Sequence, residues 1–587
     1  MLNKKIETLR KQMRQHHLDY YFVPGTDPHQ NEYLPQMWQR RTLISGFDGS
    51  NGDVVIGLEK AYLWTDGRYE LQAQNQLDHS IFEFFISAQG GGSSMSAFFA
   101  AQDRPIRLGV DPQLLSIAEA RNLQQCLAET GGALIFIPDN LIDAIHPPAP
   151  FKAEPIRILD IEYAGVSAAE KMLKLQQYLT HLHCDGLVLN DLPSIAWLFN
   201  LRGQDIPFNP LFLSYALIGP DFCTLFLNSN SLNPELTEYL YHLGVEIDEY
   251  AEFYTEYAKH NFKRLLLDPK KNNQSLMNAA QAESIHFEST PIDLWKACKN
   301  DIEIQGAIEA HQMDALAVVP FLHWLEGHGV GKTECEIADA LLAFRQKNPA
   351  FLTPSFETIP AYADNGAIMH YHAHRGHDKI VGNTTLLLVD SGGQYLAGTT
   401  DITRTVHLGT PSALEKECYT LVLKGHLALR AARFNHGARG EHLDVLARQF
   451  LWQKGYNYGH GTGHGVGAYL CVHEGPQRIS TAPTTTPLVA GMILSNEPGL
   501  YLPGRFGIRI ENLIYIKPAE VDSEFGPFYE FEDLTLAPYA RKLIAVELLS
   551  VDEITQLNLY HQKVWSTLYT HLEDDVREWL KQETAAF

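Results

Sequence analysis

The sequence predicts an α/β (α+β) fold built from successive domains, and three observations support this. The chain has 587 residues, which is too long for a single hydrophobic core. Hydrophobic residues make up 45% of it and charged residues 20%, as in ordinary globular domains. Helix-like segments alternate with short, glycine-ended strand-like segments in the first half, and this pattern changes near residue 297. We therefore expect two α/β domains followed by a third domain of different pattern.

The first half predicts a duplicated α/β domain. An amphipathic helix over Ile6–His17 precedes strand-like LDYYFVPG, GDVVIGL and KAYLWTDGRY. The proline-dense segment IHPPAPFKAEP, residues 145–155, fits neither a helix nor a strand period and predicts a linker. After it, LQQYLTHLHCDGLVL repeats the order of LRKQMRQHHLDYYFV: a helix, then an Asp before a buried strand. We place the two copies at residues 1–153 and 154–296.

The second half begins with a long helix-like stretch, KNDIEIQGAIEAHQMDALAVVPFLHWLEGH, followed by short strands and glycine-rich turns. We predict one domain over residues 297–520. Residues 521–587 form a C-terminal extension whose helical end, residues 551–583, is expected to pack on that domain.

The net charge limits the classes of possible partner, and the cysteine pattern indicates the cellular compartment. The formal charge of −24 repels phosphate backbones, so nucleic acid is not expected as a partner. Seven scattered cysteines without a CxxC pair predict a reducing, cytoplasmic location. No run of about 18 apolar residues predicts a membrane span, and the first 25 residues lack the apolar segment of a secretory signal.

Four carboxylates and one imidazole in the last third form a candidate metal site: Asp390, Asp401, His464, Glu497 and Glu511. Oxygen-rich ligand sets bind hard divalent cations such as Mn²⁺, whereas structural zinc sites prefer thiolates. Because four of the five ligands can bridge, the set predicts two metal ions, about 3.5 to 4 Å apart, that share a water or hydroxide. Such a centre performs hydrolysis.

Each of these segments also has a simpler explanation on its own. We expect TTLLLVDSGGQYLAGTTDITRTVHLG to form a strand, a Gly-Gly turn and a second strand that brings both Asp residues together. A turn residue would explain Asp390 but not Asp401. A glycine-rich loop with incidental histidines would explain GHGTGHGVGAYLCVHEGP, and a surface ion pair between Arg509 and Glu511 would explain RIE. Only the metal site explains all of them together.

Other chemistries fit less well. EGHGVGKTE is not a phosphate-binding loop because Glu326 stands where that motif needs a glycine. No GxSxG elbow or paired catalytic cysteine is present in the sequence. The histidine-rich segment MHYHAHRGHD contains one candidate for the site, His370.

Taken together, the two Asp residues eleven positions apart, TGHGVG, NEP and RIEN resemble the pita-bread metallopeptidases. LWTDGRYELQAQNQL, IAWLFNLRGQDIPFNPLFLSYALI and FEDLTLAPYARKLI extend the resemblance over nearly the whole chain, toward the long, three-domain aminopeptidases P of that family. The resemblance implies two creatinase-like N-terminal domains followed by a pita-bread catalytic domain.

The resemblance also implies roles for individual residues. Asp390 is similar to a ligand of one metal, Asp401 and Glu511 to bridging ligands, and His464 and Glu497 to ligands of the other. Further residues match positions that line or support the site: His370, His460 and His473 as histidines that bind substrate or stabilise the intermediate, and Tyr501 and Arg509 as residues that support the ligands. Glu497 is also the candidate proton acceptor.

The activity implied is hydrolysis of the bond between an N-terminal residue and a following proline, in peptides with proline in the second position. Relatives of this length also imply a homodimer. A dipeptidase specific for Xaa-Pro (a prolidase) shares the same ligands and remains an alternative. A pita-bread module that binds proteins without catalysis is a further alternative, which the intact ligand set disfavours.

Overall fold

The computed structural model describes residues 2–87 and 94–587 and contains two compact units. The first comprises Met1–Ile161 and Val166–Ile292, and the second comprises Glu162–Gly165 and Asp293–Phe587. No helix among the described residues combines the length and apolar character needed to cross a membrane. The finer division at residues 153, 296 and 520 stays a prediction.

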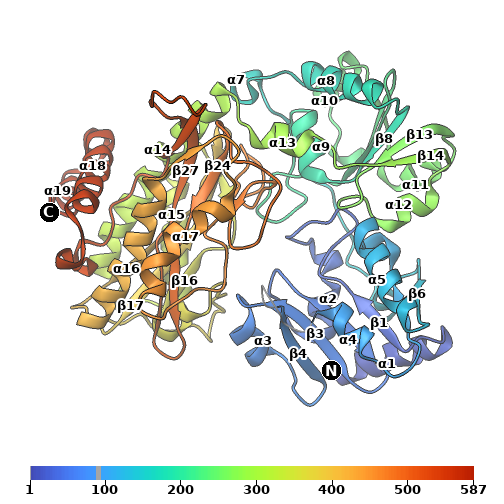
Figure 1. Cartoon of the computed structure of the whole chain (residues 1–587), viewed down its shortest axis with the longest axis horizontal. Coiled ribbons are helices and arrows are strands. Elements are labelled where there is room, and N and C mark those ends of the chain that lie inside the picture. Colours follow the sequence, from blue (N-terminus) through green and yellow to red (C-terminus); the bar gives the residue numbers. More distant parts are fainter. Residues whose placement is uncertain (1, 88–93) are drawn as a thin grey trace. The chain divides into compact units, whose positions relative to one another are not determined.

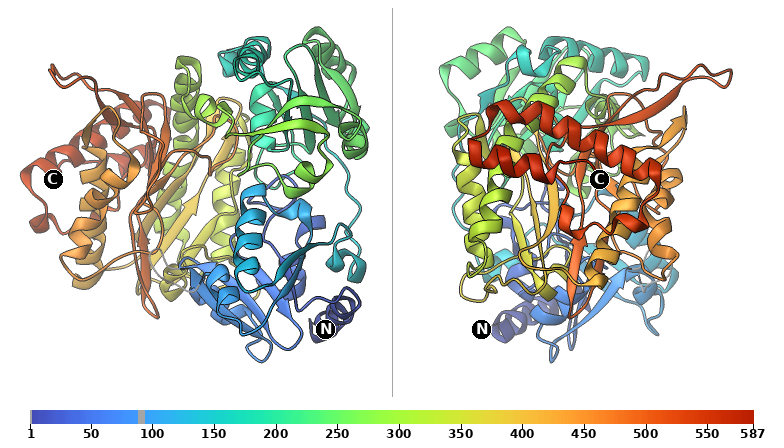
Figure 2. Two further views of the ribbon diagram at one scale, coloured as in Figure 1. Left: turned by 45° about the vertical axis from the view of Figure 1, so that its right-hand side comes forward. Right: turned by 90° about the vertical axis from the view of Figure 1, so that its left-hand side faces the viewer.

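The first unit contains two six-stranded sheets of the same topology, coloured blue and green in Figure 1 and Figure 2. Their strand orders are β4-β3-β2-β1-β5-β6 and β12-β11-β10-β8-β13-β14. β1 and β8 occupy the same place in their sheets, and each pairs antiparallel with one neighbour and parallel with the other. The remaining pairings also agree in direction between the two sheets. The predicted duplication is confirmed. The strands are β1 (Tyr20–Val23), β2 (Asp53–Gly57), β3 (Ala61–Asp66), β4 (Phe82–Ser87), β5 (Arg107–Val110), β6 (Ala133–Phe136), β8 (Gly186–Leu189), β10 (Ser214–Ile218), β11 (Cys223–Leu227), β12 (Glu246–Glu249), β13 (Phe262–Leu267) and β14 (Ala282–Phe287).

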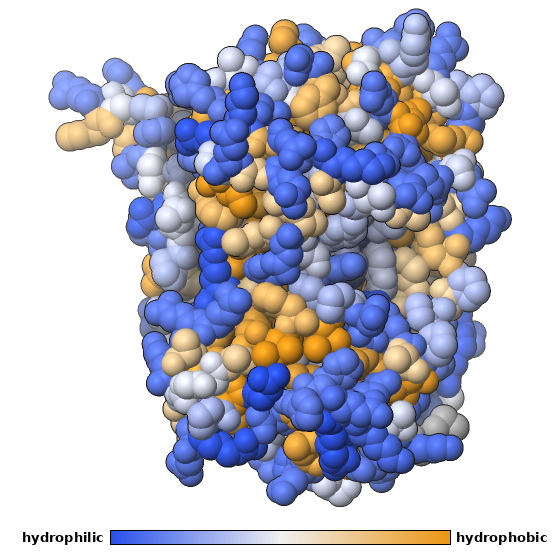
Figure 3. Space-filling view, turned by 90° about the vertical axis from the view of Figure 1, so that its right-hand side faces the viewer, coloured by the Kyte–Doolittle hydropathy of each residue, from blue (hydrophilic) through white to orange (hydrophobic). Residues whose placement is uncertain are grey.

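Helices pack on these sheets through apolar side chains. The helix predicted at the start is α1 (Leu2–Gln15), which buries Ile6, Leu9 and Met13 against the first sheet. Charged and polar residues cover most of the face shown in Figure 3, with smaller apolar patches between them, as is usual for a surface in water. The other main helices of the unit are α2 (Arg40–Ser45), α3 (Glu70–Gln76), α4 (Met95–Ala100), α5 (Ile117–Glu129), α6 (Leu141–Ile145), α8 (Ala168–His181), α9 (Leu192–Leu198), α10 (Pro234–His242), α11 (Phe253–Tyr257) and α12 (Gln274–Ala279).

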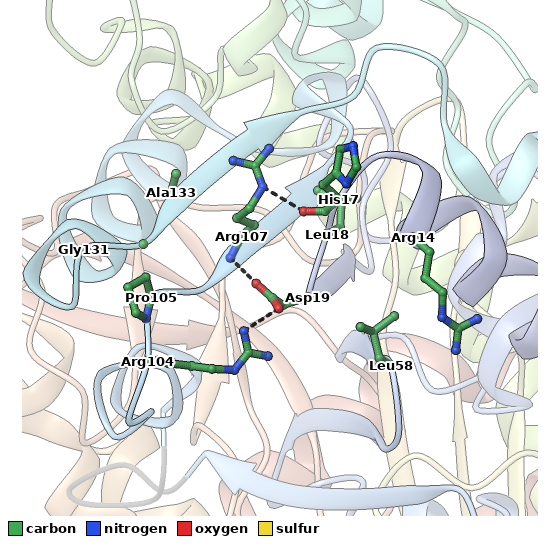
Figure 4. Close-up of a pocket in the computed structure, with 11 residues that line it drawn as sticks. Arg14, His17, Leu18, Asp19, Leu58, Arg104, Pro105, Arg107, Gly131 and Ala133 are labelled. Atoms are coloured by element: carbon green, nitrogen blue, oxygen red, sulfur yellow. Dashed lines mark hydrogen bonds and ion pairs between the residues drawn. The ribbon is translucent and has the colours of Figure 1, made fainter.

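α1 and α8 end with the same backbone conformation and the same side-chain contact, each just before a strand. His17 and His183 adopt left-handed backbone conformations, with φ of 54° and 56°, which stop each helix. The Asp two residues later then accepts a backbone N–H from the parallel neighbour: Asp19 from Arg107 at 2.8 Å, and Asp185 from Arg264 at 2.9 Å. Figure 4 shows the first copy of this contact, in a surface pocket of about 570 Å³. The weak sequence repeat therefore marks a repeated structural contact.

The second unit is built from long helices and short sheets. α14 (Asp301–His328) is the predicted long helix, and an Asn300–Glu303 capping box starts it. α15 (Glu334–Gln346) contacts α14 and β16, whereas α16 (Ala413–Arg430) and α17 (Gly440–Trp452) contact each other, and α16 also contacts β24, β25, β26 and β28. The sheets have the orders β15-β18-β19, β16-β17-β20 and β21-β28-β27-β24, and β25 pairs with β26. The strands are β15 (Phe351–Pro354), β16 (Ile359–Tyr362), β17 (Leu386–Ser391), β18 (Gly393–Tyr395), β19 (Gly398–Thr399), β20 (Ile402–His407), β21 (Arg433–Asn435), β22 (Gly463–His464), β24 (Ile493–Asn496), β25 (Gly499–Leu502), β26 (Phe506–Arg509), β27 (Asn512–Pro518) and β28 (Phe528–Asp533).

The predicted hairpin is correct in its strand pairing, but the predicted Gly-Gly turn is wrong. β17 does pair antiparallel with β20, as expected. The residues between them do not form a tight turn: β18 and β19 form a small sheet with β15. The cause is long-range pairing with a segment some 40 residues earlier in the chain, which local turn chemistry does not reveal.

The C-terminal extension packs on the second unit, as predicted. Its helices α18 (Val551–Leu568) and α19 (Asp574–Glu583), red in Figure 2, lie side by side. Val319 of α14, Val422 of α16 and Val564 of α18 are fully buried in one shared apolar cluster. The extension is therefore part of the core of this unit.

A buried ion pair also joins α14 and α15. Arg345 donates two hydrogen bonds to Asp314, at 2.8 and 3.1 Å, and the Tyr395 hydroxyl donates a third at 2.8 Å. Asp314 and Arg345 are 4% and 1% exposed, so removal of one partner leaves a buried charge without compensation.

We expect Asp314→Asn to lower the free energy of unfolding of the second unit by about 3 to 5 kcal/mol. Chemical denaturation followed by tryptophan fluorescence measures this. The matched control is Asp339→Asn, because Asp339 pairs with Arg375 in an exposed salt bridge of 2.7 Å, and exposed pairs contribute little. Equal denaturation midpoints for the two variants would contradict the prediction.

Candidate functional site

Adjacent strands bring the predicted carboxylates of the second unit together. Asp390 lies in β17, opposite Thr403 of β20, and Asp401 immediately precedes β20. An isolated bridge pairs Thr403 with Glu511, which lies between β26 and β27. The three acidic side chains therefore come from one strand arrangement.

The histidine and the fourth carboxylate come from a neighbouring pair of segments. His464 ends β22, and Glu497 directly follows β24. The Ser495 hydroxyl joins them, because it accepts the backbone N–H of His464 at 2.9 Å and donates to Glu497 Oε1 at 3.1 Å. His464 Nε2 lies 3.5 Å from both Asp401 Oδ2 and Glu497 Oε1.

The donor atoms converge as a metal site requires. Ligand atoms of Asp401, His464 and Glu511 all lie within 4.8 Å of one another. His464 Nδ1 lies 3.0 Å from the carbonyl oxygen of Gly465, and donation to that oxygen leaves Nε2 directed at the carboxylates. The other two predicted ligands adjoin this group: Glu497 lies beside His464, and Asp390 is opposite Thr403, whose hydroxyl donates to Glu511.

The negative charge of the cluster exceeds what the nearby Arg509 compensates. Burial, followed by the charges of Asp401, Glu497 and Asp390, raises the pKa of Glu511 well above its ordinary range. Burial raises the pKa of Asp390 and of Glu497 as well. Like charges at this spacing, out of water, favour protonation or a bound cation.

Two buried carboxylate oxygens without hydrogen-bond partners among the described residues indicate that a cation binds here. Asp390 Oδ1 and Asp401 Oδ1 have no hydrogen-bond partner within the described chain. Buried polar atoms are nearly always satisfied, so such orphans need an explanation. Burial alone would lower the pKa of His464, yet the hydrogen bond to Asp401 and the charge of Glu497 raise it to about 9. A metal ion would take the place of that proton and satisfy both oxygens.

A hydrogen-bonded chain leads from the ligands to His460. Arg509 donates to Asp390 at 2.5 Å and to the Tyr501 hydroxyl at 2.8 Å. The Tyr501 hydroxyl lies 2.8 Å from His460 Nε2, and His460 Nδ1 lies 2.7 Å from the carbonyl oxygen of Gly461. If Nδ1 donates to that carbonyl, Tyr501 donates to Nε2. Burial raises the pKa of Tyr501 to about 12, which keeps the hydroxyl proton in place.

The two remaining predicted histidines also lie near the cluster. The rings of His473 and His464 are nearly perpendicular, with centroids 4.4 Å apart. His370 is half-buried and follows Met369, whose carbonyl oxygen accepts a hydrogen bond from Arg509 at 3.3 Å. In the same segment, His372 lies 3.1 Å from Glu357.

Sequence reasoning missed two hydroxyls that hold the ligands. Thr403 donates to Glu511 Oε2 at 2.7 Å and accepts from Arg509 at 3.2 Å. Ser495 plays the corresponding part beside Glu497. A signal was available for both: each stands two residues from a predicted ligand, and alternate residues of a strand share a face.

The pocket of Figure 4 is a different place in the chain. Its lining residues all belong to the first unit and include Arg14, Arg104 and Arg107. It contains none of the predicted site residues. The carboxylate cluster of the second unit is therefore the candidate active site.

Comparison with known proteins gives the same picture. Residues 305–518 match metallopeptidase family M24, and residues 527–587 match the C-terminal region of that peptidase family. Residues 5–139 and 146–303 each match the creatinase/prolidase N-terminal domain.

Individual relatives match over the whole length. The chain is 40% identical to a probable Xaa-Pro aminopeptidase P of Aspergillus niger, with 99% of this chain and 98% of the relative covered. The crystal structure of an X-prolyl aminopeptidase from Caenorhabditis elegans, described as a cytosolic enzyme with a di-nuclear active site, matches with a TM-score of 0.96 at 34% identity and covers 100% of both chains. A Xaa-Pro dipeptidase from Bacillus anthracis matches with a TM-score of 0.51 at 26% identity, and covers 64% of this chain and 99% of its own. With full-length matches of this kind, the chain belongs to metallopeptidase family M24 and, within it, to the Xaa-Pro aminopeptidases P.

Proposed function

We propose that this protein is a two-metal aminopeptidase that hydrolyses the bond between an N-terminal residue and a following proline. One observation supports this most directly: buried carboxylates with orphaned oxygens converge on an oriented imidazole. Full-length similarity to Xaa-Pro aminopeptidases supports the same substrate class. The full-length matches are to Xaa-Pro aminopeptidases, and this favours release from peptides over dipeptide cleavage.

Five residues would hold the ions. We assign Asp390 to one metal, His464 and Glu497 to the other, and Asp401 and Glu511 to both as bridging ligands. The set contains no thiolate and is rich in oxygen, which favours Mn²⁺ as the metal. When bound, the two ions supply a Lewis acid for the scissile carbonyl and a water of lowered pKa.

The protein's own residues manage protons and orientation. We assign Glu497 as the acceptor of the proton of the attacking water, because its carboxylate lies beside His464 among the ligands. His473 and His370 donate hydrogen bonds to the oxygen of the scissile carbonyl, which typically contributes about 3 to 4 kcal/mol to a transition state. The Gly461 carbonyl favours the His460 tautomer with its proton on Nδ1, and the Tyr501 hydroxyl holds the other ring nitrogen in place.

Substrate choice follows from the peptide bond before proline. That amide is tertiary and has no N–H, so a site that requires no donor there accepts it. The substrate's free amino group is attracted by the acidic cluster. We therefore propose peptides with proline in the second position as the substrates.

Three further properties are proposed with narrower support. Seven free cysteines favour a reducing compartment and hence the cytoplasm. The resemblance to long relatives supports a homodimer. The order of the matched families supports two creatinase-like domains, a catalytic domain and a C-terminal extension.

We expect Asp401→Asn and Glu511→Gln to lower kcat/KM for a Xaa-Pro-Pro peptide by more than about 100-fold. Each variant removes a charge that the bridge between two cations needs, while the strands stay paired. Metal analysis is expected to show less metal per chain, with an unchanged circular dichroism spectrum. Asp339→Asn, a surface change of the same kind, is the control. A ligand variant with full turnover would contradict the assignment.

Chelation is expected to abolish activity reversibly. Treatment with EDTA followed by dialysis removes both ions, and titration with Mn²⁺ restores turnover better than Zn²⁺, because the ligands are hard oxygen donors. The measurement is turnover against added metal for each ion. Recovery with Zn²⁺ alone would rule out the proposed preference.

Substrate length separates the aminopeptidase from the dipeptidase. We expect a Xaa-Pro-Pro tripeptide and longer Xaa-Pro peptides to be cleaved with kcat/KM at least about tenfold above that of a Xaa-Pro dipeptide, an energy difference of about 1.4 kcal/mol. Liquid chromatography of the released N-terminal residue measures both rates. The opposite order of rates would favour the dipeptidase.

A further inference from the structure

Arg404 of β20 is a buried guanidinium surrounded by neutral acceptors. Its side chain is 2% exposed. No carboxylate among the described residues lies within 4 Å of it. Instead its five N–H groups contact six acceptors: the carbonyl oxygens of Thr403 (3.0 Å), Glu511 (2.7 Å), Ala537 (2.9 Å) and Pro538 (3.0 Å), Asn512 Oδ1 (2.8 Å) and the Tyr560 hydroxyl (3.2 Å). The two N–H groups of Nη2 are shared among the last two and Ala537.

The acceptors on one side belong to the ligand framework. Glu511 itself offers its backbone carbonyl to Arg404, and its backbone N–H donates to Thr403 at 3.1 Å. The Thr403 hydroxyl then donates to the Glu511 carboxylate at 2.7 Å. Arg404 and Thr403 therefore fix the backbone of Glu511 from both sides and its side chain from one.

The acceptors on the other side belong to the C-terminal extension. Ala537 and Pro538 follow β28, and Tyr560 lies on α18. Tyr560 also accepts the backbone N–H of Ala537 at 3.3 Å, so α18 holds the 537–538 segment in place. The extension thus supplies three of the six acceptors.

A guanidinium out of water depends on acceptors of this kind. Burial of an uncompensated charge is unfavourable, and hydrogen bonds to its donors offset that cost. If the extension moved, Arg404 would lose half of its acceptors, and its contact with the Glu511 carbonyl would no longer be held. The extension and the backbone of Glu511 are therefore coupled through one side chain.

We propose that Arg404 is a positioning residue for Glu511, and that the C-terminal extension serves the metal site through it. The inference rests on the proposed role of Glu511 as a bridging ligand. It adds a function to residues 535–560, which contain none of the predicted ligands. The planar fork of arginine is essential here, because lysine cannot reach acceptors on both sides at once.

Two variants and a control test the proposal. Arg404→Lys keeps the charge but loses the fork, and Tyr560→Phe removes one acceptor of the extension at nearly constant volume. Tyr569→Phe is the matched control, because Tyr569 is 40% exposed and stacks on Trp565. All three are made in the full chain, and Mn²⁺ binding to the metal-free protein is measured by calorimetry alongside turnover.

The expected result is a change in metal binding with peptide binding preserved. Arg404→Lys raises the Mn²⁺ concentration for half-saturation by about 10 to 100-fold, the range for residues that orient metal ligands. It lowers kcat at limiting metal, leaves KM for the peptide unchanged and is rescued by excess Mn²⁺. Tyr560→Phe changes the same quantities in the same direction by less, and Tyr569→Phe changes neither.

Other outcomes would overturn the proposal in recognisable ways. If Arg404→Lys and Tyr560→Phe lower the unfolding midpoint but leave Mn²⁺ binding unchanged, the contact is only structural. If Arg404→Lys does not fold, Tyr560→Phe decides by the same measurement. If the unmodified protein binds no metal, or binds it and cleaves no Xaa-Pro peptide, the proposed function itself has failed.

Discussion

Mutual repulsion among four closely spaced carboxylates, three of them buried, is the constraint on which the second unit depends. Burial and neighbouring charge raise the pKa of Asp390, Glu497 and Glu511 together. Arg509 forms an ion pair with Asp390. Two divalent cations would match the charge of the four carboxylates. The surrounding scaffold must keep the ligands in place and away from water before the ions bind.

That scaffold relies on strands and on close backbone approach. Paired strands fix Asp390 and the segment after Asp401, because ladder hydrogen bonds leave little freedom in register. Gly463 allows β22 to approach β24, since a Cβ there would overlap the carbonyl oxygen of Ser495. This approach brings His464 to Glu497. Gly463 is therefore required by the geometry of the ligands themselves.

Much of the fold and most of the site could be predicted from short segments. The ligands were accessible because five metal-binding side chains occur together in the last third of the chain, although no single motif was decisive. The duplication was accessible because α1 and α8 each end before an Asp and a buried strand. The small sheet formed by β18 and β19 could not be predicted, since its partner β15 is distant in the chain. The role of Arg404 was equally hidden, because its partners Glu511, Ala537 and Tyr560 lie more than 100 residues away.

The neutral surroundings of Arg404 have an electrostatic consequence. A carboxylate partner would cancel the charge of the guanidinium and add another negative group beside an acidic cluster. Carbonyl, amide and hydroxyl oxygens satisfy its donors and leave the positive charge in place. The field is felt nearby: burial, and then the charge of Arg404, lowers the pKa of His426 and of His561 to about 3. The C-terminal extension, by supplying uncharged acceptors, therefore leaves this buried positive charge uncancelled.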